Sequence, residues 1–371
     1  MNPYIPDSLP IEDLDFKRLF PLATKANAAL ARYDGLLQGI PNPVVMLSPL
    51  TRQEAVLSSK IEGTQATVDE VLEYEAGMLK EGEKEQDIKE IVNYRSALMQ
   101  ASQHLETYPI RLGLVREMHK ILLSSVRGQN KTPGEFRVDQ NWIGKEGCPI
   151  EEATFVPPEP VSMSGFLRDW EEYLEIEDLD CLVQAAVMHA QFELIHPFKD
   201  GNGRIGRILI PLFLFQKKTL AHPMFYLSQY LEENRDEYYL RLGAISKDGD
   251  WDGWIAFFLQ AIIEQAKENS TKVQAIMGLY EKMKEDIHKI THSQYTVYLL
   301  DAIFTRPTFQ TSDCASELKQ NFGVHEKTTL GLLRQLRDAD LLLELEAGSG
   351  RRASRLCFPQ LINLAEGKKV L

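Results

Sequence analysis

The sequence predicts a mainly α-helical protein, and three observations lead to that fold class. Apolar residues recur mostly at spacings of three and four, the period of helices with one buried face. Runs that alternate apolar and polar residues are few. A length of 371 residues allows two or three domains, and 44% hydrophobic residues is enough to form buried cores.

Composition and termini exclude several classes of protein. The amino-terminal residues lack the basic and apolar segments of a signal peptide, and the longest apolar run, residues 208–215, is too short to cross a bilayer. We therefore expect a cytoplasmic protein with no membrane partner. A net charge of -13 argues against a surface that coats nucleic acid throughout, although a local basic patch stays allowed.

The cysteines indicate neither disulfides nor structural zinc. They form no Cys-x-x-Cys pair and no histidine lies at a zinc-site spacing. Reduced and partly buried thiols are expected at all four positions, which are Cys148, Cys181, Cys314 and Cys357.

Several helices are expected in the first third of the chain, after a Pro-punctuated segment at residues 41–43. A helix-like run over residues 49–63 meets a glycine at its last position, which is a common carboxy-terminal stop. Thr67 and Glu70 have the spacing of a capping box and predict the start of another helix. Two amphipathic helices, 87–105 and 110–123, should follow.

The middle of the chain begins with an irregular segment. Alternation over residues 136–143, a turn at 144–147 and a second short run predict a β-hairpin over about 136–156. A helix over 161–174 should follow the hairpin. A further apolar helix is expected over 179–195.

The segment His196-Pro-Phe-Lys-Asp-Gly-Asn-Gly-Arg-Ile-Gly-Arg207 then interrupts the helical pattern. Pro197 cannot simply continue the preceding helix, because its ring removes a donor and crowds the turn before it. Two glycines around an asparagine follow, and a strongly apolar helix resumes over 204–216. Such a loop brings backbone N–H groups and a helix amino terminus to one point, an arrangement that binds phosphates.

The side chains of this segment suggest phosphoryl or nucleotidyl transfer. Arg204 and Arg207 are three residues apart and can hold separate phosphate oxygens from one side of the helix. Asp200 offers a hard oxygen ligand for Mg²⁺, and His196 could remove the proton of an incoming hydroxyl. Each feature alone is more often a cap, a turn or a solvated face. Their combination in one short segment favours the functional interpretation.

The segment matches the pattern HPFx(D/E)GNGRxxR at every specified position, and the chain therefore resembles the Fic (filamentation induced by cAMP) family. The P-loop and protein-kinase motifs are absent. The resemblance implies a helical fold and transfer of AMP from ATP to a protein Ser, Thr or Tyr, including those of the protein itself. It also implies His196 as the base, Phe198 as a core anchor and Asp200 as the Mg²⁺ ligand. The implied triphosphate ligands are Gly201, Asn202, Gly203, Arg204 and Arg207.

A second motif of the same family lies upstream. Residues 58–63, Ser-Ser-Lys-Ile-Glu-Gly, have the form (S/T)xxxE(G/N), which the resemblance marks as an inhibitory helix. Glu62 would form an ion pair with Arg207, occupy the place of the γ-phosphate and turn the α-phosphate away from attack. Ser58 belongs to the same motif. Without the downstream motif, this segment would be an ordinary helix end.

The resemblance also implies nucleotide contacts outside the glycine loop. The hairpin resembles the family's flap, which borders the nucleotide and pairs with the target backbone. Its predicted contacts are Asn141, Trp142, Ile143 and Gly144, and the alternative is an exposed hairpin with one buried Trp. Tyr239 lies where related proteins have an adenine-side tyrosine. Aromatic pairs such as Tyr238-Tyr239 are otherwise usually part of a core.

The last part of the chain changes character. After a long helical stretch through Lys284, helices are expected over 295–303, over 311–322 with a good amino-terminal cap, and over 328–339. Two short strands, 341–345 and 355–358, should form a hairpin with a basic tip. This order of elements resembles a winged helix.

A winged helix commonly binds DNA, and Arg351, Arg352 and Arg355 could contact phosphates. Protein contact or formation of a homodimer is an equally acceptable use of such a fold in so acidic a chain. The sequence thus leaves DNA and protein partners open.

Three domains are expected, over residues 1–108 with the inhibitory helix, 109–265 with the Fic core, and 266–371 with the winged helix. The favoured function is an ATP- and Mg²⁺-dependent protein adenylyltransferase restrained by Glu62. One alternative is a DNA-binding regulator whose Fic site senses nucleotide. Another is an enzyme that removes AMP, with Glu62 aligning a water.

Overall fold

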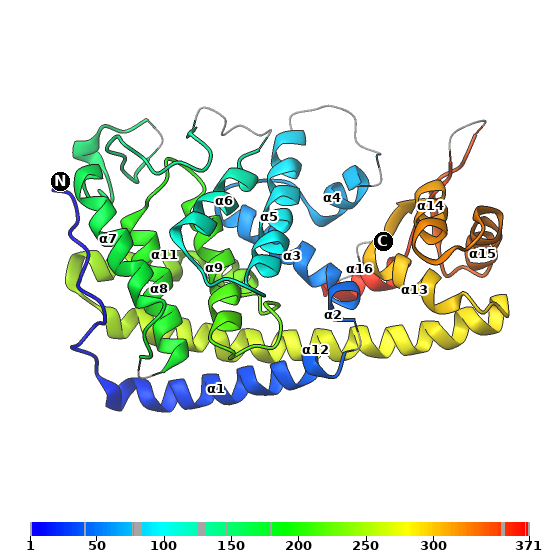
Figure 1. Ribbon diagram of the computed structural model, residues 1–371, viewed down its shortest axis with the longest axis horizontal. Helices are drawn as coiled ribbons and strands as arrows, with labels where there is room; N and C mark the ends of the chain where they lie inside the picture. Colours follow the sequence, from blue (N-terminus) through cyan, green and yellow to red (C-terminus); the bar gives the residue numbers. More distant parts are fainter. Residues whose placement is uncertain are drawn as a thin grey trace. The chain divides into compact units, whose positions relative to one another are not determined.

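The computed structural model confirms the mainly helical fold class. Figure 1 shows its helices along the chain, together with one small antiparallel sheet. Among the described residues, no helix combines the length and the apolar character that a bilayer crossing requires. The structure describes residues 2–40, 42–75, 77, 84–124, 131–145, 147–178, 180–349, 353–367 and 369.

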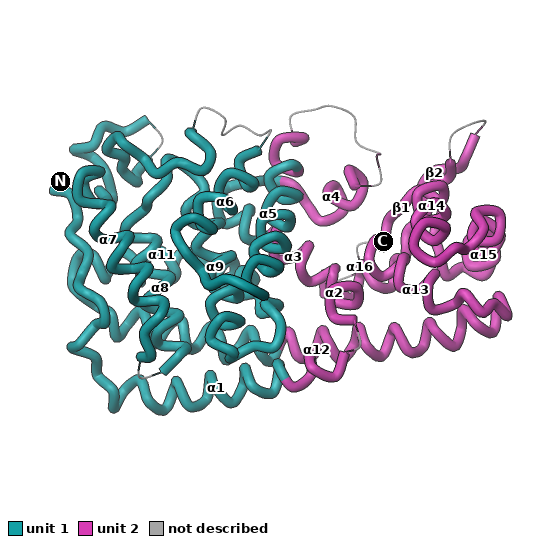
Figure 2. Tube along the Cα trace, in the orientation of Figure 1, with its two compact units in different colours: residues 1–34, 57–65, 89–267 teal, residues 35–56, 66–88, 268–371 magenta. Residues whose placement is uncertain are grey.

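The chain forms two compact units, coloured separately in Figure 2. Both are built from segments that are distant in sequence. The three-domain division expected from the sequence stays a prediction. Unit 1 comprises Met1–Asp34, Leu57–Gln65 and Lys89–Lys267, and unit 2 comprises Gly35–Val56, Ala66–Ile88 and Glu268–Leu371.

The helices that the hydrophobic period predicted are confirmed with small shifts at their ends, and the structure adds others that were not predicted. In the first half of the chain they are α1 (Phe16–Gln38), α2 (Pro43–Met46), α3 (Ser48–Ile61), α4 (Val68–Glu75), α5 (Glu85–His104), α6 (Leu112–Leu122) and α7 (Pro160–Tyr173). In the second half they are α8 (Cys181–Ile195), α9 (Asn202–Gln216), α10 (Ser228–Glu233), α11 (Arg235–Asp248), α12 (Trp251–Thr291), α13 (Thr296–Thr305), α14 (Thr311–Phe322), α15 (Glu326–Asp338) and α16 (Pro359–Glu366).

Helices α8 and α9 form the centre of unit 1. Both are apolar on nearly all sides, which is typical of helices buried in a core. They pack against each other, α7 and α11 contact α8, and α6 contacts α9. Asp180 caps the start of α8 by accepting hydrogen bonds from the N–H groups of Leu182 and Val183, at 2.9 and 3.1 Å. The loop between the two helices therefore lies at one end of the buried core of unit 1.

The segment predicted as a hairpin is less regular than expected. Between residues 136 and 156, the described residues contain one isolated bridge, Ile143 to Phe155, and the 3₁₀ helix η2 (Ile150–Glu152). The backbone bonds outside the segment, because the N–H of Arg137 donates to the carbonyl of Pro197 at 2.9 Å. Pairing with the loop after α8 replaces part of the cross-strand ladder.

Unit 2 contains the sheet. Strands β1 (Thr308–Gln310), β2 (Leu343–Glu346) and β3 (Arg355–Cys357) lie in the order β1-β3-β2, and both pairings are antiparallel. The hairpin of β2 and β3 and the preceding helices α13 to α15 confirm the expected elements. Strand β1 was not predicted, and α14 starts after Gln310 without the expected side-chain cap. The winged-helix identity of this region stays a prediction.

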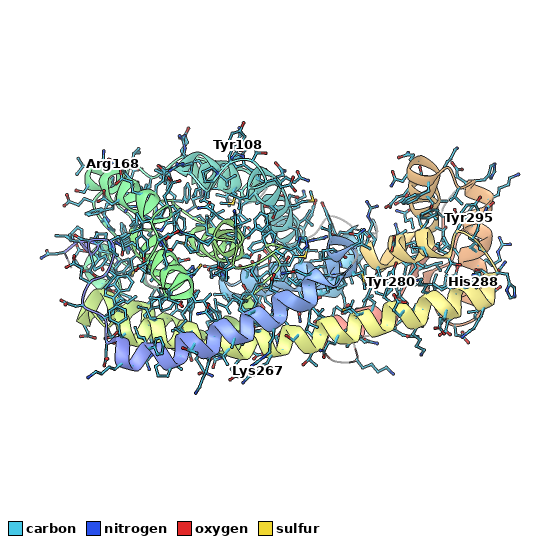
Figure 3. All side chains as sticks on the ribbon, turned by 60° about the horizontal axis from the view of Figure 1, so that its bottom comes forward. Tyr108, Arg168, Lys267, Tyr280, His288 and Tyr295 are labelled. Atoms are coloured by element: carbon cyan, nitrogen blue, oxygen red, sulfur yellow. The ribbon has the colours of Figure 1, made fainter. Side chains whose placement is uncertain are left out.

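The second part of α12 is joined to α13 by an aromatic contact within unit 2. The hydroxyl of Tyr280 donates to Asp301 at 2.6 Å, and its ring meets Phe304 edge-on at 5.0 Å. Figure 3 shows Tyr280 and His288 along α12, with Tyr295 just before α13. These contacts attach α13, the helix that precedes β1, to α12.

The predicted nucleic-acid contact of Arg355 is wrong. Arg355 is 6% exposed, its Nη1 forms an ion pair with Glu346 at 2.5 Å, and its Nη2 donates to the carbonyl of Gly77. A guanidinium held this way is part of the core of unit 2. Arg351 and Arg352 lie outside the described residues.

Candidate active site

The loop between α8 and α9 is closed by its own asparagine. His196 and Gly201 both have left-handed backbones, with φ of 48° and 78°, and reverse the chain at the two ends of the loop. Asn202 accepts a hydrogen bond from the N–H of Phe198 at 2.8 Å and donates to the Phe198 carbonyl at 2.9 Å. The side chain of Asn202, predicted to bind phosphate, is therefore bonded within the loop.

Replacing Asn202 by alanine should destabilise the protein. Asn202 is 2% exposed, and its loss leaves the buried N–H of Phe198 without its acceptor. We expect the free energy of unfolding to fall by about 1–3 kcal/mol, measured by denaturant titration. Lys199→Ala in the same loop is the control, because its ion pair with the exposed Asp139 contributes at most about 1 kcal/mol. Equal stability of the two variants would contradict a stabilising role of the two hydrogen bonds between Asn202 and Phe198.

The first turn of α9 already faces a carboxylate. A Cβ atom added to Gly203 would lie 2.2 Å from Oε1 of Glu62, so the carboxylate lies directly against this glycine. Unpaired N–H groups and the positive end of the helix dipole favour an anion at this position. Glu62 thus occupies a position at α9 where a phosphate oxygen would be favoured.

Arg207 is bound to the last turn of α3. It is 2% exposed, its Nε donates to Oγ of Ser58 at 2.8 Å, and its Nη2 donates to the Ser58 carbonyl at 2.8 Å and to Oε1 of Glu62 at 2.6 Å. Burial opposes the charge of Glu62, but the attraction and hydrogen bond of Arg207 lower the pKa of this carboxyl overall. The ion pair expected from the sequence is present and charged.

Arg204 has different acidic partners. Its Nη1 lies 2.5 Å from Glu90 and its Nη2 lies 3.1 Å from Oδ1 of Asp200. Asp200 also accepts from the N–H of Gly201 at 2.6 Å, and its side chain is 45% exposed. No three His, Cys, Asp or Glu side chains form a metal-binding group in the part of the chain that the structure describes. The two arginines are thus each neutralised by carboxylates.

His196 is electrically neutral at physiological pH. Burial, with a contribution from Arg137, lowers the pKa of its imidazole to about 4, although Glu193, Glu62 and Asp200 act in the opposite direction. Its Nδ1 lies 3.3 Å from the carbonyl of Glu193, which indicates that Nδ1 carries the proton. The Nε2 lone pair of such an imidazole can accept a proton.

Sequence reasoning missed the role of Arg137. This residue is 2% exposed, and its guanidinium donates to the carbonyls of His196 at 2.9 Å and Pro158 at 2.6 Å. Burial lowers its pKa to about 10. Arg137 therefore satisfies carbonyl groups at the end of α8, which helices otherwise leave unpaired. The sequence shows an arginine at the start of the alternating run 136–143, but the spacing of residues does not reveal which carbonyl groups it contacts.

Sequence reasoning also missed Glu193, one turn before His196. Its Oε1 is buried and has no hydrogen-bond partner among the described residues. A Cβ added to Gly206 would lie 2.2 Å from this atom, so the glycine makes the necessary space. Burial raises the pKa of Glu193 to about 8, Arg207 opposes that rise, and Glu62 adds to it. The carboxyl is therefore mainly protonated at neutral pH.

The raised pKa of Glu193 predicts a loss of stability at alkaline pH. The folded protein keeps a proton that the unfolded chain releases near pH 4.5, so this contribution is complete below that pH and is lost as the pH rises through about 8. Between pH 6 and pH 9 the unfolding free energy should fall by about 3 kcal/mol more than in Glu193→Gln. Denaturant titrations at both pH values measure this difference. Glu237→Gln is the exposed control, and identical pH dependence of all three proteins would refute the assignment.

Of the four predicted flap residues, Asn141 is the one with a hydrogen bond to the loop among the described contacts. Nδ2 of Asn141 donates to the carbonyl of Phe198 at 3.2 Å. Trp142 and Ile143 are 41% and 43% exposed, so the alternative of a buried Trp is wrong. Gly144 lies against Cys148, whose sulfur would be 2.6 Å from an added Cβ. Exposed apolar side chains beside the loop are compatible with a binding role that stays a prediction.

The two adjacent tyrosines differ in environment. Tyr238 is 1% exposed and its hydroxyl lies 2.9 Å from Nε2 of the buried His189, so Tyr238 belongs to the core. Tyr239 is 44% exposed, and its ring lies 5.5 Å from the guanidinium of Arg235. Burial raises the pKa of Tyr239 to about 12, and Glu62 adds to that rise. Tyr239 is thus the more accessible of the two, and its adenine-side role stays a prediction.

Two family models match the chain. The model described as "Fic/DOC family N-terminal" matches residues 20–103, and the model described as "Fic/DOC family" matches residues 109–214. The second match contains the glycine loop, and the first contains Ser58 and Glu62. Together they cover about half of the chain.

Curated relatives have modest identity. A probable protein adenylyltransferase of Aquifex aeolicus, aq_aa38, is 28% identical over 177 residues, which are 47% of this chain and 51% of the relative. The protein adenylyltransferase fic-1 of Caenorhabditis briggsae is 27% identical over 210 residues, which are 55% of this chain and 36% of the relative. The aligned regions thus cover about half or less of these relatives.

Solved structures share the fold. A Fic family protein from Desulfovibrio desulfuricans has a TM-score of 0.57 at 19% identity, over 96% of this chain and 98% of that one. Fic-1 from Caenorhabditis elegans has a TM-score of 0.52 at 22% identity, over 71% of this chain and 73% of that one. At these identities the similarities concern the fold.

Proposed function

This chain belongs to the Fic/DOC family, and from that premise we propose that it is a protein adenylyltransferase. It would move AMP from ATP to a Ser, Thr or Tyr hydroxyl of a protein, itself included. The names of the curated relatives support this class of activity. The observation that carries the proposal is the neutral His196 at the end of α8, followed by a glycine loop that opens α9.

The triphosphate of ATP would bind at the start of α9. The N–H groups of Gly201, Asn202 and Gly203 lie at its amino terminus, where an anion is favoured. Arg207 supplies a fork of donors to the same turn, as its contacts with Glu62 and Ser58 illustrate. Productive binding would exchange the Glu62 carboxylate for phosphate oxygens.

Asp200 would hold Mg²⁺ beside the proposed triphosphate site. A carboxylate that is 45% exposed offers a hard oxygen ligand, and phosphate oxygens would complete the coordination. When bound, the ion would neutralise charge on the phosphates and orient them. Arg204, paired with Asp200 and Glu90, keeps that carboxylate beside the loop.

The proposed reaction is one displacement at the α-phosphorus. Nε2 of His196 takes the proton of the attacking hydroxyl, whose oxygen forms a bond to the α-phosphorus. The bond between that phosphorus and the bridging oxygen breaks, and pyrophosphate leaves. Negative phosphates beside the ring would raise its basicity during the reaction. The products are an adenylylated hydroxyl, pyrophosphate and a protonated His196.

We infer further that Glu62 restrains the enzyme. Its carboxylate lies against Gly203 and takes a donor of Arg207, so it competes for the position of a phosphate. A misplaced γ-phosphate would turn the α-phosphorus out of line with the hydroxyl, and misalignment costs rate steeply. The resting protein would therefore hold ATP in an unproductive position.

The identity of the transferred group tests the proposal. The Glu62→Gly variant is incubated with Mg²⁺ and ATP labelled either at the α- or at the γ-phosphate, and its intact mass is measured. Label from the α-phosphate alone, with the mass of AMP added, is the expected result. Label from the γ-phosphate would identify a kinase, and no label on the variant or on added protein would refute the activity. Release of AMP from a previously labelled protein by the native chain would identify the reverse activity.

A further inference from the structure

His119 on α6 is buried and plays no part in the reaction proposed above. His119 is 0% exposed. Its Nδ1 accepts a hydrogen bond from the N–H of Gly134 at 2.9 Å, and its Nε2 lies 3.0 Å from the carbonyl of Asp200. A carbonyl can only accept, so Nε2 carries the proton and the ring has one defined tautomer. One imidazole thus bonds to two segments that border the site.

The ring also supports the loop by packing. It stacks on Phe198 with centroids 3.8 Å apart and an angle of 9° between the planes. Phe198 in turn meets Phe136 at 5.1 Å. A Cβ added to Gly201 would lie 3.2 Å from Leu122 and 3.6 Å from the His119 ring. The glycine loop therefore lies directly on one face of α6.

The bond to Asp200 fixes the orientation of a peptide group. In a trans peptide the C=O and the following N–H point in opposite directions. With the Asp200 carbonyl held against α6, the N–H of Gly201 points away from α6, where Oδ1 of Asp200 accepts it at 2.6 Å. His119 thereby directs an N–H group of the proposed phosphate site.

The bond to Gly134 fixes the segment that follows α6. Nε of Arg116 donates to the Gly134 carbonyl at 2.7 Å, so α6 holds this glycine by both backbone groups. Three residues later, Arg137 donates from its Nε to the carbonyl of His196. The segment from Gly134 to Arg137 therefore connects α6 to the proposed base.

We propose that His119 is a positioning residue that holds the glycine loop and the 134–137 segment in one fixed relation. In this way it aligns His196 with the phosphate-binding turn, without touching the reacting atoms. The catalytic part of this inference rests on the proposed function. The structural coupling of the two segments does not.

The test uses His119→Phe in the full-length Glu62→Gly protein. Phenylalanine keeps the stacking on Phe198 and removes both hydrogen bonds. Amide hydrogen exchange, measured by mass spectrometry, should become faster in residues 131–145 and in residues 196–207. The kcat for AMP transfer should fall about 10- to 100-fold, because small misalignments are costly. The KM for ATP should change by less than about threefold, because Arg207 and the helix terminus still bind phosphates.

His104→Phe is the matched control, because this histidine lies on α5 and contacts Tyr108 instead of the loop. It should change neither exchange in the two segments nor kcat. Unchanged exchange in either segment of His119→Phe would overturn the coupling, and an unchanged kcat per folded molecule would overturn the catalytic role. If the parent transfers no AMP, the proposed function fails and the exchange data still decide the coupling. If His119→Phe does not fold, ¹⁵N NMR of the unchanged protein decides, and a ring protonated on Nδ1 instead of Nε2 would overturn the proposal.

Discussion

Glu62→Gly should raise the rate of AMP transfer about 10- to 100-fold. Hydrogen bonds between charged groups are worth about 1.5–3 kcal/mol, and each 1.4 kcal/mol corresponds to a factor of ten. Removing the carboxylate leaves Arg207 and the first turn of α9 available to the γ-phosphate. The measurement is the initial rate of transfer from α-labelled ATP to the protein itself or to added protein.

Two further variants make this result specific. Lys60→Ala on the same helix removes an ion pair with Glu232 whose lysine is 53% exposed, and it should leave the rate unchanged. Ser58→Ala should give a smaller increase than Glu62→Gly, because it removes the bond from Arg207 to the Ser58 hydroxyl but keeps the ion pair between Arg207 and Glu62. A Glu62→Gly rate equal to that of the native protein would rule out restraint by this ion pair.

His196→Ala in the Glu62→Gly background should lower the rate of transfer about 10²- to 10⁴-fold, the usual contribution of a general base. The imidazole is the group at the end of α8 that can accept the hydroxyl proton, since its pKa of about 4 keeps it neutral. Binding of ATP should persist, because Arg207 and the helix terminus do not depend on this ring. The comparison therefore needs both the initial rate and the ATP dissociation constant.

The histidine at position 189 is the matched control for this loss. His189→Gln changes an imidazole that is buried in the core and bonds to Tyr238 and to the Gly206 carbonyl. It should affect stability more than the rate per folded molecule. Full activity of the His196→Ala protein would show that the proton leaves by another route, and loss of ATP binding would assign His196 to nucleotide binding.

Local physics explains why most helices followed from the sequence. The period of apolar residues predicted a helix over 161–174, and α7 spans Pro160–Tyr173. The capping box is also confirmed, because the N–H of Glu70 donates to Oγ1 of Thr67 at 3.3 Å and the N–H of Thr67 donates to Glu70 at 2.9 Å. Such elements depend on neighbours within a few residues.

Elements that depend on distant partners were predicted less well. The alternating pattern over 136–156 indicated a hairpin, but Arg137 bonds to the loop after α8 and the ladder is reduced to one bridge. Arg355 was predicted to contact phosphates, yet it is buried and paired with Glu346. Strand β1 has three residues, too few for a clear period.

The sequence by itself determined the course of the backbone at the loop, because His196-Pro197 followed by Gly201-Asn-Gly203 favours a helix end, a tight loop and a new helix start within a few residues. It also indicated the Glu62 and Arg207 pair through a motif. Only the tertiary structure decided what supports the loop. Arg137, Glu193 and His119 act through burial and through bonds to segments up to 81 residues away, and spacing along the chain carries no record of such contacts.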